Sequence, residues 1–258
     1  MMMQRVTGPR WKGKGFADIA AENPMSQIVK KLESSMKQSR IKAILTGSVS
    51  LLEASTELAD LLNRSCIGRQ IPNAEEDKHW FQLSSEETMY LQHALQSLVV
   101  VDEKGRPLND LELWNVMKDR REAFLELYKA YVHLRGKNWV VRPGSQYGVD
   151  FVAYRHHPAL VHSEYAIVVL SEGDRNGEKC SRLREWSDVQ CCVRLSGSVA
   201  KKLLVFFIDR KGIDETLPSC IQRFNVDELI ITRWVPEQNR EECQKNDDAC
   251  NSEKVPAT

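Results

Sequence analysis

Short apolar runs separated by turns dominate the second half of the chain, and this pattern predicts a β-sheet. Several of the runs are apolar on both faces, which is typical of strands near the centre of a sheet. The five runs expected to form strands are NWVV, GVDFVAY, EYAIVVL, KLLVFFID and DELIITRW. One helix is predicted among them, over residues 187–200, with a capping box formed by Ser187 and Gln190.

The first half of the chain has apolar positions at helical spacing instead. Helices are predicted over residues 26–37, 53–68, 84–97, 109–117 and 121–136, and strands over 41–47 and 98–101. The helix at 26–37 carries many charges and is expected to be exposed. Capping boxes are predicted at Ser84 with Glu87 and at Asn109 with Glu112. Gly136 is expected to end the last helix in a left-handed conformation.

These patterns divide the chain into four regions. Residues 1–24 are basic with few apolar side chains, so a flexible N-terminus is expected there. Residues 25–135 are expected to form a small N-terminal α+β domain, and residues 136–236 a second, mixed αβ domain. Residues 237–258 are polar and acidic, and a disordered tail is expected.

Charge and cysteine content narrow the class of protein. Lys and Arg total 36, as do Asp and Glu, so any site for a polyanion must be a local cluster. This balance argues mildly against an RNA or DNA binder that acts alone. Seven cysteines, an odd number without a CxxC pair, indicate a reducing compartment rather than a disulfide framework. No run of about eighteen apolar residues occurs, so an intracellular protein without a membrane span is expected.

The most unusual stretch is a polar loop with three histidines, which follows the strand that ends at Tyr154. If the strands on either side pair antiparallel, Tyr154 and His162 face each other at direct or diagonal positions. A phenol and an imidazole would then border a common space. A less specific interpretation remains open, in which Tyr154 caps the core and the histidines are solvated turn residues. A metal site at His156, His157 and His162 is less favoured because neighbouring histidines point opposite ways on an extended chain.

Two further positions could support a phosphate site. Arg194 and Lys201 are seven residues apart, so a continuous helix would place both on one face, with the small residues Gly197 and Ser198 between them. The alternative is an ordinary solvated face that Gly197 ends early. Trp234, at the end of the last apolar run, could stack on a base, although packing at a sheet edge is the commoner role of such a tryptophan.

Together these residues resemble the tRNA-splicing endonuclease family, specifically its eukaryotic catalytic subunit assigned to the 5′ splice site. The resemblance extends from about Glu86 to Trp234 and includes ALQSLVV, PLNDLELW, RLSGSVAKKLL and ITRW. Its most specific part is the strand YGxDFxxY, with a histidine in HSxY eight residues after the last tyrosine. A distant lysine followed by an apolar strand completes the pattern.

The resemblance implies a fold, a site and an assembly. The C-terminal domain should be a mixed-sheet nuclease domain of the restriction-endonuclease-like type. The family's catalytic tyrosine, histidine and lysine fall on Tyr154, His162 and Lys201. The arginine and tryptophan that grip a base of the intron bulge fall on Arg194 and Trp234. No cofactor or metal is implied; the partners are pre-tRNA and the other subunits of a nuclear heterotetramer with two catalytic and two structural chains.

The reaction that these residues would perform is internal transfer of a phosphodiester. Tyr154 would take the proton of a 2′-hydroxyl, His162 would protonate the leaving 5′-oxygen, and Lys201 would stabilise the phosphorane. Tyrosine is a demanding base, because only ~0.1% is ionised at neutral pH, a deficit of roughly 4 kcal/mol. We expect the charge of Lys201 to reduce this deficit. The products would be a 2′,3′-cyclic phosphate and a 5′-hydroxyl.

Three other functions remain possible from the sequence. The chain could be a non-catalytic subunit that binds RNA or scaffolds the complex, although it keeps all three candidate catalytic residues. It could be a metal-dependent nuclease or hydrolase built on the three histidines. It could also be an interaction domain in which the loop is incidental, and only the joint spacing of Tyr154, His162 and Lys201 argues against this.

Overall fold

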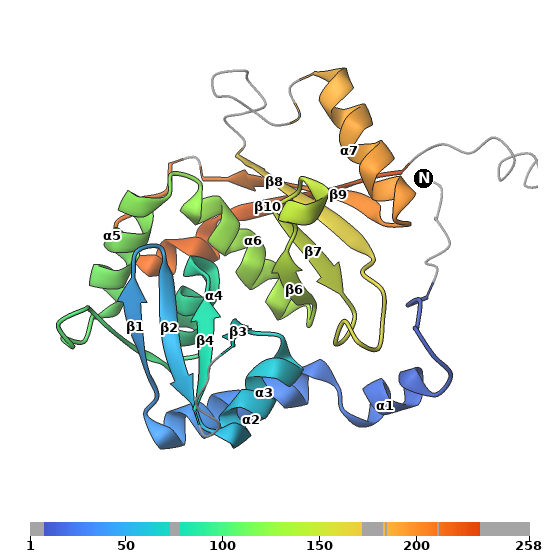
Figure 1. Cartoon of the computed structure of the whole chain (residues 1–258). Helices are drawn as coiled ribbons and strands as arrows, with labels where there is room; N and C mark the ends of the chain where they lie inside the picture. The colour runs from blue at the N-terminus through green and yellow to red at the C-terminus, as the bar shows by residue number, and fades with distance from the viewer. Residues whose placement is uncertain (1–7, 73–77, 172–182, 184, 211, 233–258) are drawn as a thin grey trace, which may run out of the picture.

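Two five-stranded sheets form the framework of the protein (Figure 1). The computed structural model describes residues 8–72, 78–171, 183, 185–210 and 212–232. The first sheet has the strand order β3-β4-β2-β1-β5 and the second has the order β10-β9-β8-β7-β6. The mixed αβ fold expected from the sequence is therefore confirmed.

The first sheet is built from short strands of the N-terminal half. They are β1 (Lys42–Thr46), β2 (Val49–Ala54), β3 (Arg69–Ile71), β4 (His79–Leu83) and β5 (Val99–Val101). Pairing is antiparallel except between β1 and β5, which run parallel. The sequence predicts β1 and β5 but misses β2, β3 and β4. β2 runs almost directly into the periodicity of the next helix, β3 contains one apolar residue, and β4 has a polar residue on each face.

Seven helical segments accompany this sheet. They are α1 (Phe16–Glu22), α2 (Met25–Ser39), α3 (Thr56–Ser65), α4 (Ser85–Met89), the π-helix η1 (Tyr90–Ala94), α5 (Asp110–Arg120) and α6 (Phe124–Gly136). Both capping boxes predicted for the starts of α4 and α5 are present. Helix α2 is not simply exposed, because one face buries Met25, Ile28, Leu32 and Met36. The left-handed residue after α6 is Asn138, with φ 62°, and not Gly136, which is still helical.

The second sheet contains the five strands predicted for the C-terminal half. They are β6 (Val140–Pro143), β7 (Phe151–Tyr154), β8 (Tyr165–Ser171), β9 (Lys202–Asp209) and β10 (Asn225–Ile231). All neighbours pair antiparallel except β8 and β9, which are parallel. Parallel neighbours require a crossover, and helix α7 (Trp186–Ser198) lies in it. The 3-10 helices η2 (Ser145–Tyr147) and η4 (Pro218–Arg223) lie in the loops.

Helix α7 differs from its prediction at both ends. Its capping box is formed by Glu185 and Asp188, not by Ser187 and Gln190. The helix ends at Ser198, where the N–H of Ala200 donates to the carbonyl of Gly197 at 3.0 Å. Lys201 therefore lies outside the helix, and the expected helical face shared by Arg194 and Lys201 does not exist. The helix ends early, as the alternative interpretation proposed, but it continues through Gly197 to Ser198.

One hydrophobic core connects the two halves of the chain. A single cluster of buried side chains includes Leu32 and Leu52 from the first half, Tyr128 from α6, and Ile167 and Phe206 from the second sheet. Helix α6 lies between the sheets and contacts β6, β8 and β9, whereas α7 lies on the outer side of the second sheet (Figure 1). The division into two domains at residue 135 stays a prediction, and the two parts are joined by a shared core.

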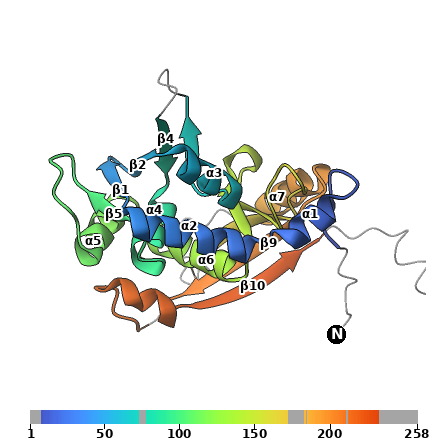
Figure 2. The same ribbon diagram turned by 90° about the horizontal axis from the view of Figure 1, so that it is seen from below.

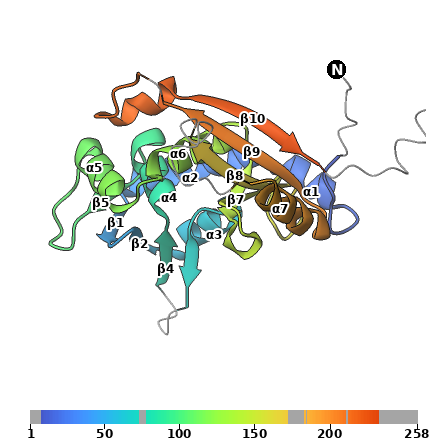
Figure 3. The same ribbon diagram turned by 90° about the horizontal axis from the view of Figure 1, so that it is seen from above.

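Residues 8–24, for which the sequence suggests a flexible segment, include helix α1 and an isolated bridge between Trp11 and Val161. The start of this segment lies beside the end of α7 (Figures 2 and 3). Its attachment depends on backbone hydrogen bonds, which leave no signature in the pattern of side chains. Among the described residues, no helix has both the length and the apolar character needed to cross a membrane.

Candidate active site

The ends of three neighbouring strands bring the three candidate catalytic residues to one edge of the second sheet. Tyr154 is the last residue of β7, His162 lies three residues before β8, and Lys201 immediately precedes β9. Because β8 is antiparallel to β7 and parallel to β9, the end of β7 meets the starts of β8 and β9. The antiparallel hairpin predicted around the histidine loop is confirmed.

The hydrogen-bond ladder continues past the strand ends to these residues. Ala153 is paired with Tyr165, and the N–H of Glu164 donates to the Ala153 carbonyl at 2.9 Å. On the other side, the N–H of Lys202 donates to the Glu164 carbonyl at 2.9 Å. Glu164 therefore lies between the β7 end, which carries Tyr154, and the start of β9. His162 lies two residues before Glu164 in the chain, at a position diagonal to Tyr154.

Tyr154 is half-buried between two parts of the core. On one side it packs against a cluster that the N-terminal half supplies in large part, formed by Met25, Ile28, Cys66 and Val140. On the other side it contacts the cluster between the second sheet and α7, which includes Val152 and Val168. Helices α2 and α3 therefore help to fix the candidate base, although the resemblance was weakest in this part of the chain.

Burial raises the pKa of Tyr154 above the ordinary tyrosine value, and its neighbours act in both directions. A hydrogen bond with the Ser163 side chain and the positive charge of Arg142 lower the pKa, whereas Tyr147 and the Cys66 thiol raise it. The net direction is upward, so the neutral phenol is favoured in the chain alone. Burial likewise raises the pKa of the Cys66 thiol to about 11.

Arg142 is a functional candidate that sequence reasoning missed. Its Nη1 donates to the carbonyl of Gly68 at 2.9 Å, which ties β6 to the loop after α3. Its charge lowers the pKa of both Tyr154 and the Cys66 thiol. The lowering of the Tyr154 pKa was expected from Lys201, but the cation identified beside Tyr154 is Arg142. No motif marks it, because only the fold brings β6 to this place.

Lys201 is held over an aromatic ring. Its Nζ lies 4.0 Å from the ring centroid of Tyr147. Tyr147 ends the short helix η2, where its N–H donates to the Gly144 carbonyl at 2.8 Å, and Gly148 follows with φ 66°. Glycine suits this left-handed position because it has no Cβ. The loop between β6 and β7 thus presents the Tyr147 ring to the lysine.

His162 is exposed and its backbone is fixed by the N-terminal segment. The N–H of His162 donates to the carbonyl of Arg10 at 3.0 Å. The Arg10 side chain extends further, and its Nη2 donates to the carbonyl of Ala200 at 2.8 Å. Ala200 directly precedes Lys201 and has a left-handed backbone with φ 53°. Arg10 is a second residue that the sequence analysis did not single out.

The three histidines of the loop have separate environments. His156 is buried, and its Nε2 donates to the carbonyl of Asn23 at 2.8 Å. The Nδ1 of His157 accepts from the N–H of Ala159 at 3.1 Å, while His162 is exposed. No group of three His, Cys, Asp or Glu side chains within the described part of the chain is arranged to hold a metal ion. The metal-dependent alternative therefore has no support in this geometry.

Arg194 lies on α7 beside the end of β10. Together with Trp186, Val193 and Ile231 it lines a groove of about 460 Å³ that contains more apolar than polar atoms. Trp234, the other residue predicted to contact RNA, lies outside the described residues.

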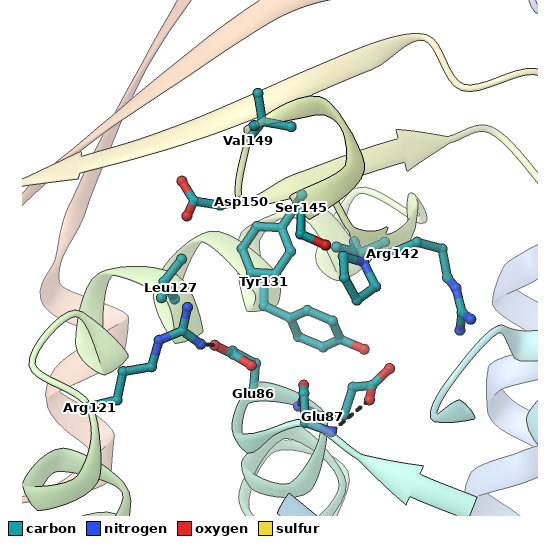
Figure 4. A pocket seen from close by; sticks show the side chains of 14 residues that line it. Glu86, Glu87, Arg121, Leu127, Tyr131, Arg142, Ser145, Val149 and Asp150 are labelled. Carbon is teal, nitrogen blue, oxygen red and sulfur yellow. Dashed lines mark hydrogen bonds and ion pairs between the residues drawn. The ribbon is translucent and has the colours of Figure 1, made fainter. Parts of the chain in front are cut away.

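A second cavity, of about 470 Å³, lies between the N-terminal half and the β6–β7 loop and contains none of the three candidate catalytic residues (Figure 4). Glu86 on one wall pairs with Arg121 at 2.8 Å. Both carboxylate oxygens of Glu87 accept backbone N–H groups, from Gly68 and Ser84, at 2.9 Å. These polar groups already have protein partners, so we interpret this cavity as a packing gap between the two halves of the chain.

Comparison with known proteins defines the class to which this edge of the sheet belongs. Residues 124–215 match the model of the tRNA intron endonuclease catalytic C-terminal domain. The match begins at the start of α6, twelve residues before the predicted domain boundary, and includes Tyr154, His162 and Lys201. The catalytic domain thus includes the helix on which its sheet packs.

The relatives extend this similarity to nearly the whole chain. A probable tRNA-splicing endonuclease subunit Sen2 of Oryza sativa subsp. japonica is 50% identical over 97% of this chain and 88% of its own. The tRNA-splicing endonuclease subunit Sen2-1 of Arabidopsis thaliana is 48% identical over 91% and 98%. The Sen2 subunit of Mus musculus is 32% identical over 62% of this chain and 36% of its own. The chain belongs to the Sen2 family of tRNA-splicing endonuclease subunits, and it is an endonuclease.

Proposed function

We propose that this chain cleaves pre-tRNA at the 5′ splice site, one of the two intron–exon junctions, as the catalytic subunit of the splicing endonuclease. The observation that carries the proposal is the convergence of Tyr154, His162 and Lys201 on the ends of three adjacent strands inside the matched catalytic domain. A phenol, an imidazole and an ammonium at one sheet edge can supply the base, the acid and the positive charge that internal transfer of a phosphodiester requires.

The proposed reaction needs no metal, because the nucleophile is already tethered to its target. Tyr154 takes the proton of the 2′-hydroxyl while the 2′-oxygen bonds to phosphorus. His162 gives a proton to the 5′-oxygen as its bond to phosphorus breaks. Lys201 stabilises the negative charge of the phosphorane. The products are a 2′,3′-cyclic phosphate and a 5′-hydroxyl, which makes the reaction that of an RNA-cleaving lyase.

The raised pKa of Tyr154 makes proton abstraction by its phenol more demanding. A phenol that is neutral in the chain alone can act as a base only if its environment favours the anion at the moment of attack. The Ser163 hydrogen bond and the Arg142 charge both act in that direction. Bound RNA would carry its phosphate to Lys201, so this lysine acts on the phosphorane rather than on the resting phenol.

The test is cleavage of an intron-containing pre-tRNA by the assembled complex in the presence of a chelator. Tyr154→Phe, His162→Ala and Lys201→Ala are each expected to lower the rate by about 10²–10⁴-fold. His157→Ala is the matched control, since it removes a histidine from the same loop and should cost much less. Full activity of His162→Ala would contradict the proposal, as would 3′-phosphate or 2′-phosphate ends in place of cyclic phosphate.

We further propose that the chain works in a heterotetramer with a second catalytic subunit and two structural subunits. Strand β10 supports this, because it is the edge strand of the second sheet and pairs only with β9 among the described strands (Figures 2 and 3). Leu229 and Ile230 on β10 are exposed large apolar side chains. An uncovered apolar edge is suited to pairing with a strand of another chain.

Arg194 and Trp234 are proposed to contact RNA. The groove beside Arg194 on α7 supports a role for the arginine, since it combines a cation with an apolar wall. We also propose a nuclear location, in line with the resemblance to the nuclear assembly. Imaging of the tagged chain tests the location, and confinement to the cytoplasm or to an organelle would overturn it.

A further inference from the structure

We propose that the N-terminal segment 8–12 completes the active site, and that Arg10 is a positioning residue that sets His162 relative to Lys201. The proposal rests on the proposed function, because it concerns the same acid and the same lysine. It adds a residue far outside the matched catalytic domain, which begins at residue 124.

The segment is attached to the histidine loop by an antiparallel arrangement of backbone groups. Trp11 forms a bridge with Val161. The N–H of Lys12 donates to the carbonyl of Leu160 at 2.9 Å, and the N–H of His162 donates to the carbonyl of Arg10 at 3.0 Å. Since β8 begins only at Tyr165, these hydrogen bonds hold residues 160–162 of the loop, which precede the strand.

The side chain of the same residue reaches the turn before the lysine. Nη2 of Arg10 donates to the Ala200 carbonyl at 2.8 Å. This carbonyl belongs to the peptide group that joins Ala200 to Lys201, and Ala200 has the left-handed φ of 53°. The N–H of Lys201 donates in turn to the Ser196 carbonyl at 2.8 Å. The guanidinium therefore braces a strained turn from outside.

Arg10 thus connects the candidate acid and the candidate cation of the site. Its carbonyl accepts from the N–H of His162, and its guanidinium donates to the carbonyl of Ala200, the residue before Lys201. The acid and the phosphorane-stabilising cation must keep a fixed spacing across one phosphate, and small displacements of reacting groups are costly in rate. Loss of the Arg10 side chain frees the α7–β9 turn while the backbone bond to His162 stays. The chemical step should therefore suffer more than RNA binding.

If Arg10 acted only through its positive charge, its substitution would have a different effect on cleavage. A basic segment that only attracts phosphate changes affinity and its salt dependence, and any nearby lysine should matter as much as Arg10. Lys14 is the matched control, because it is exposed two residues after this segment and its side chain has no hydrogen bond or ion pair to any described residue. Comparison of the two variants separates positioning from attraction.

The experiment measures single-turnover cleavage of pre-tRNA by the reconstituted complex, at saturating enzyme and over a range of enzyme concentrations. Arg10→Ala is expected to lower the maximal rate by about 10-fold to 100-fold with less than about threefold change in apparent affinity. Lys14→Ala should leave the maximal rate unchanged. Arg10→Lys keeps a donor and should recover part of the rate. Added guanidinium should restore Arg10→Ala in part but not His162→Ala.

Each outcome of this experiment supports or overturns the positioning role of Arg10. If Arg10→Ala keeps the wild-type maximal rate, or loses only affinity as Lys14→Ala does, the positioning role is wrong. A loss that neither Arg10→Lys nor guanidinium relieves, together with a lower melting temperature of the complex, would mean that Arg10 is only structural and would also overturn it. If His162→Ala is fully active, the proposed function itself fails, whatever Arg10 does.

Discussion

The ammonium of Lys201 lies 4.0 Å from the centre of the Tyr147 ring. Among the described residues no carboxylate forms an ion pair with this lysine, so its charge is oriented by an aromatic face without being neutralised. A cation held in this way remains available to an incoming phosphate. The β6–β7 loop therefore belongs to the site, although it contains none of the three residues that would take part in the chemistry.

Replacement of Tyr147 should slow cleavage by misplacing Lys201. A cation–π contact contributes about 0.5–2 kcal/mol, so Tyr147→Leu is expected to reduce the maximal rate by roughly 3-fold to 30-fold. Tyr147→Phe keeps the ring face and should stay within about twofold of the wild type. Single-turnover kinetics on the two variants provide the comparison. Equal losses in both would show that the ring does not hold the lysine.

Ser163 should act on the reaction only through Tyr154. Its hydrogen bond lowers the pKa of the phenol, so Ser163→Ala is expected to raise that pKa further and to slow cleavage several-fold at neutral pH. The double-mutant cycle with Tyr154→Phe is the decisive measurement, because the serine substitution should have almost no effect once the phenol is absent. Additive losses in rate would show that Ser163 does not act through Tyr154.

The folded state should lose stability in alkaline solution. Burial raises the pKa of Tyr128 and of Tyr131, so both stay protonated in the fold at a pH where the unfolded chain ionises. Below about pH 10 neither state has lost the proton and stability is unaffected; above it, each tyrosine costs up to about 1.4 kcal/mol per pH unit. Urea unfolding between about pH 8 and 11 measures this slope.

A control for the alkaline effect is Tyr128→Phe, which removes one of the ionising groups and one weak hydrogen bond, from its hydroxyl to the Met89 carbonyl at 3.4 Å. Its unfolding free energy should fall less steeply above about pH 10 than that of the wild type. Identical slopes would assign the alkaline loss to other groups.

Assembly should depend on the edge strand β10. Leu229 is 49% exposed on this strand, so Leu229→Glu is expected to leave the fold intact and to weaken association with the partner subunits. Leu195→Glu is the matched control, since Leu195 is 48% exposed but lies on α7. Co-purification and size-exclusion chromatography report the outcome. Normal assembly of Leu229→Glu would rule out β10 as the contact.

Local sequence patterns predicted the elements of the second sheet well. The apolar runs around Tyr154 and after His162 are short and bounded by turns, and both strands occur where expected, paired antiparallel. The spacing of these two residues was informative because a hairpin converts separation along the chain into proximity. In the same way, the polar caps at Ser84 and Asn109 correctly marked the starts of two helices.

What the sequence could not predict depends on contacts between distant segments. Lys201 was expected on a helical face because the local pattern left open whether the helix stops near Gly197, and the helix ends at Ser198. Arg142 and Arg10 reach the site from β6 and from the start of the chain, and both bind backbone carbonyls, which any residue provides. The upward pKa of Tyr154 follows from packing against Met25 and Ile28, which is visible only in the fold.

The bond between Arg10 and Ala200 joins residues 190 positions apart. Contacts of such long sequence separation close late in folding, because the loop entropy has to be overcome first. A chain still emerging from the ribosome already has its first residues but lacks the turn that they brace. The nuclease would thus acquire its competence only after the turn at Ala200 has been made, which would keep shorter chains from cutting RNA.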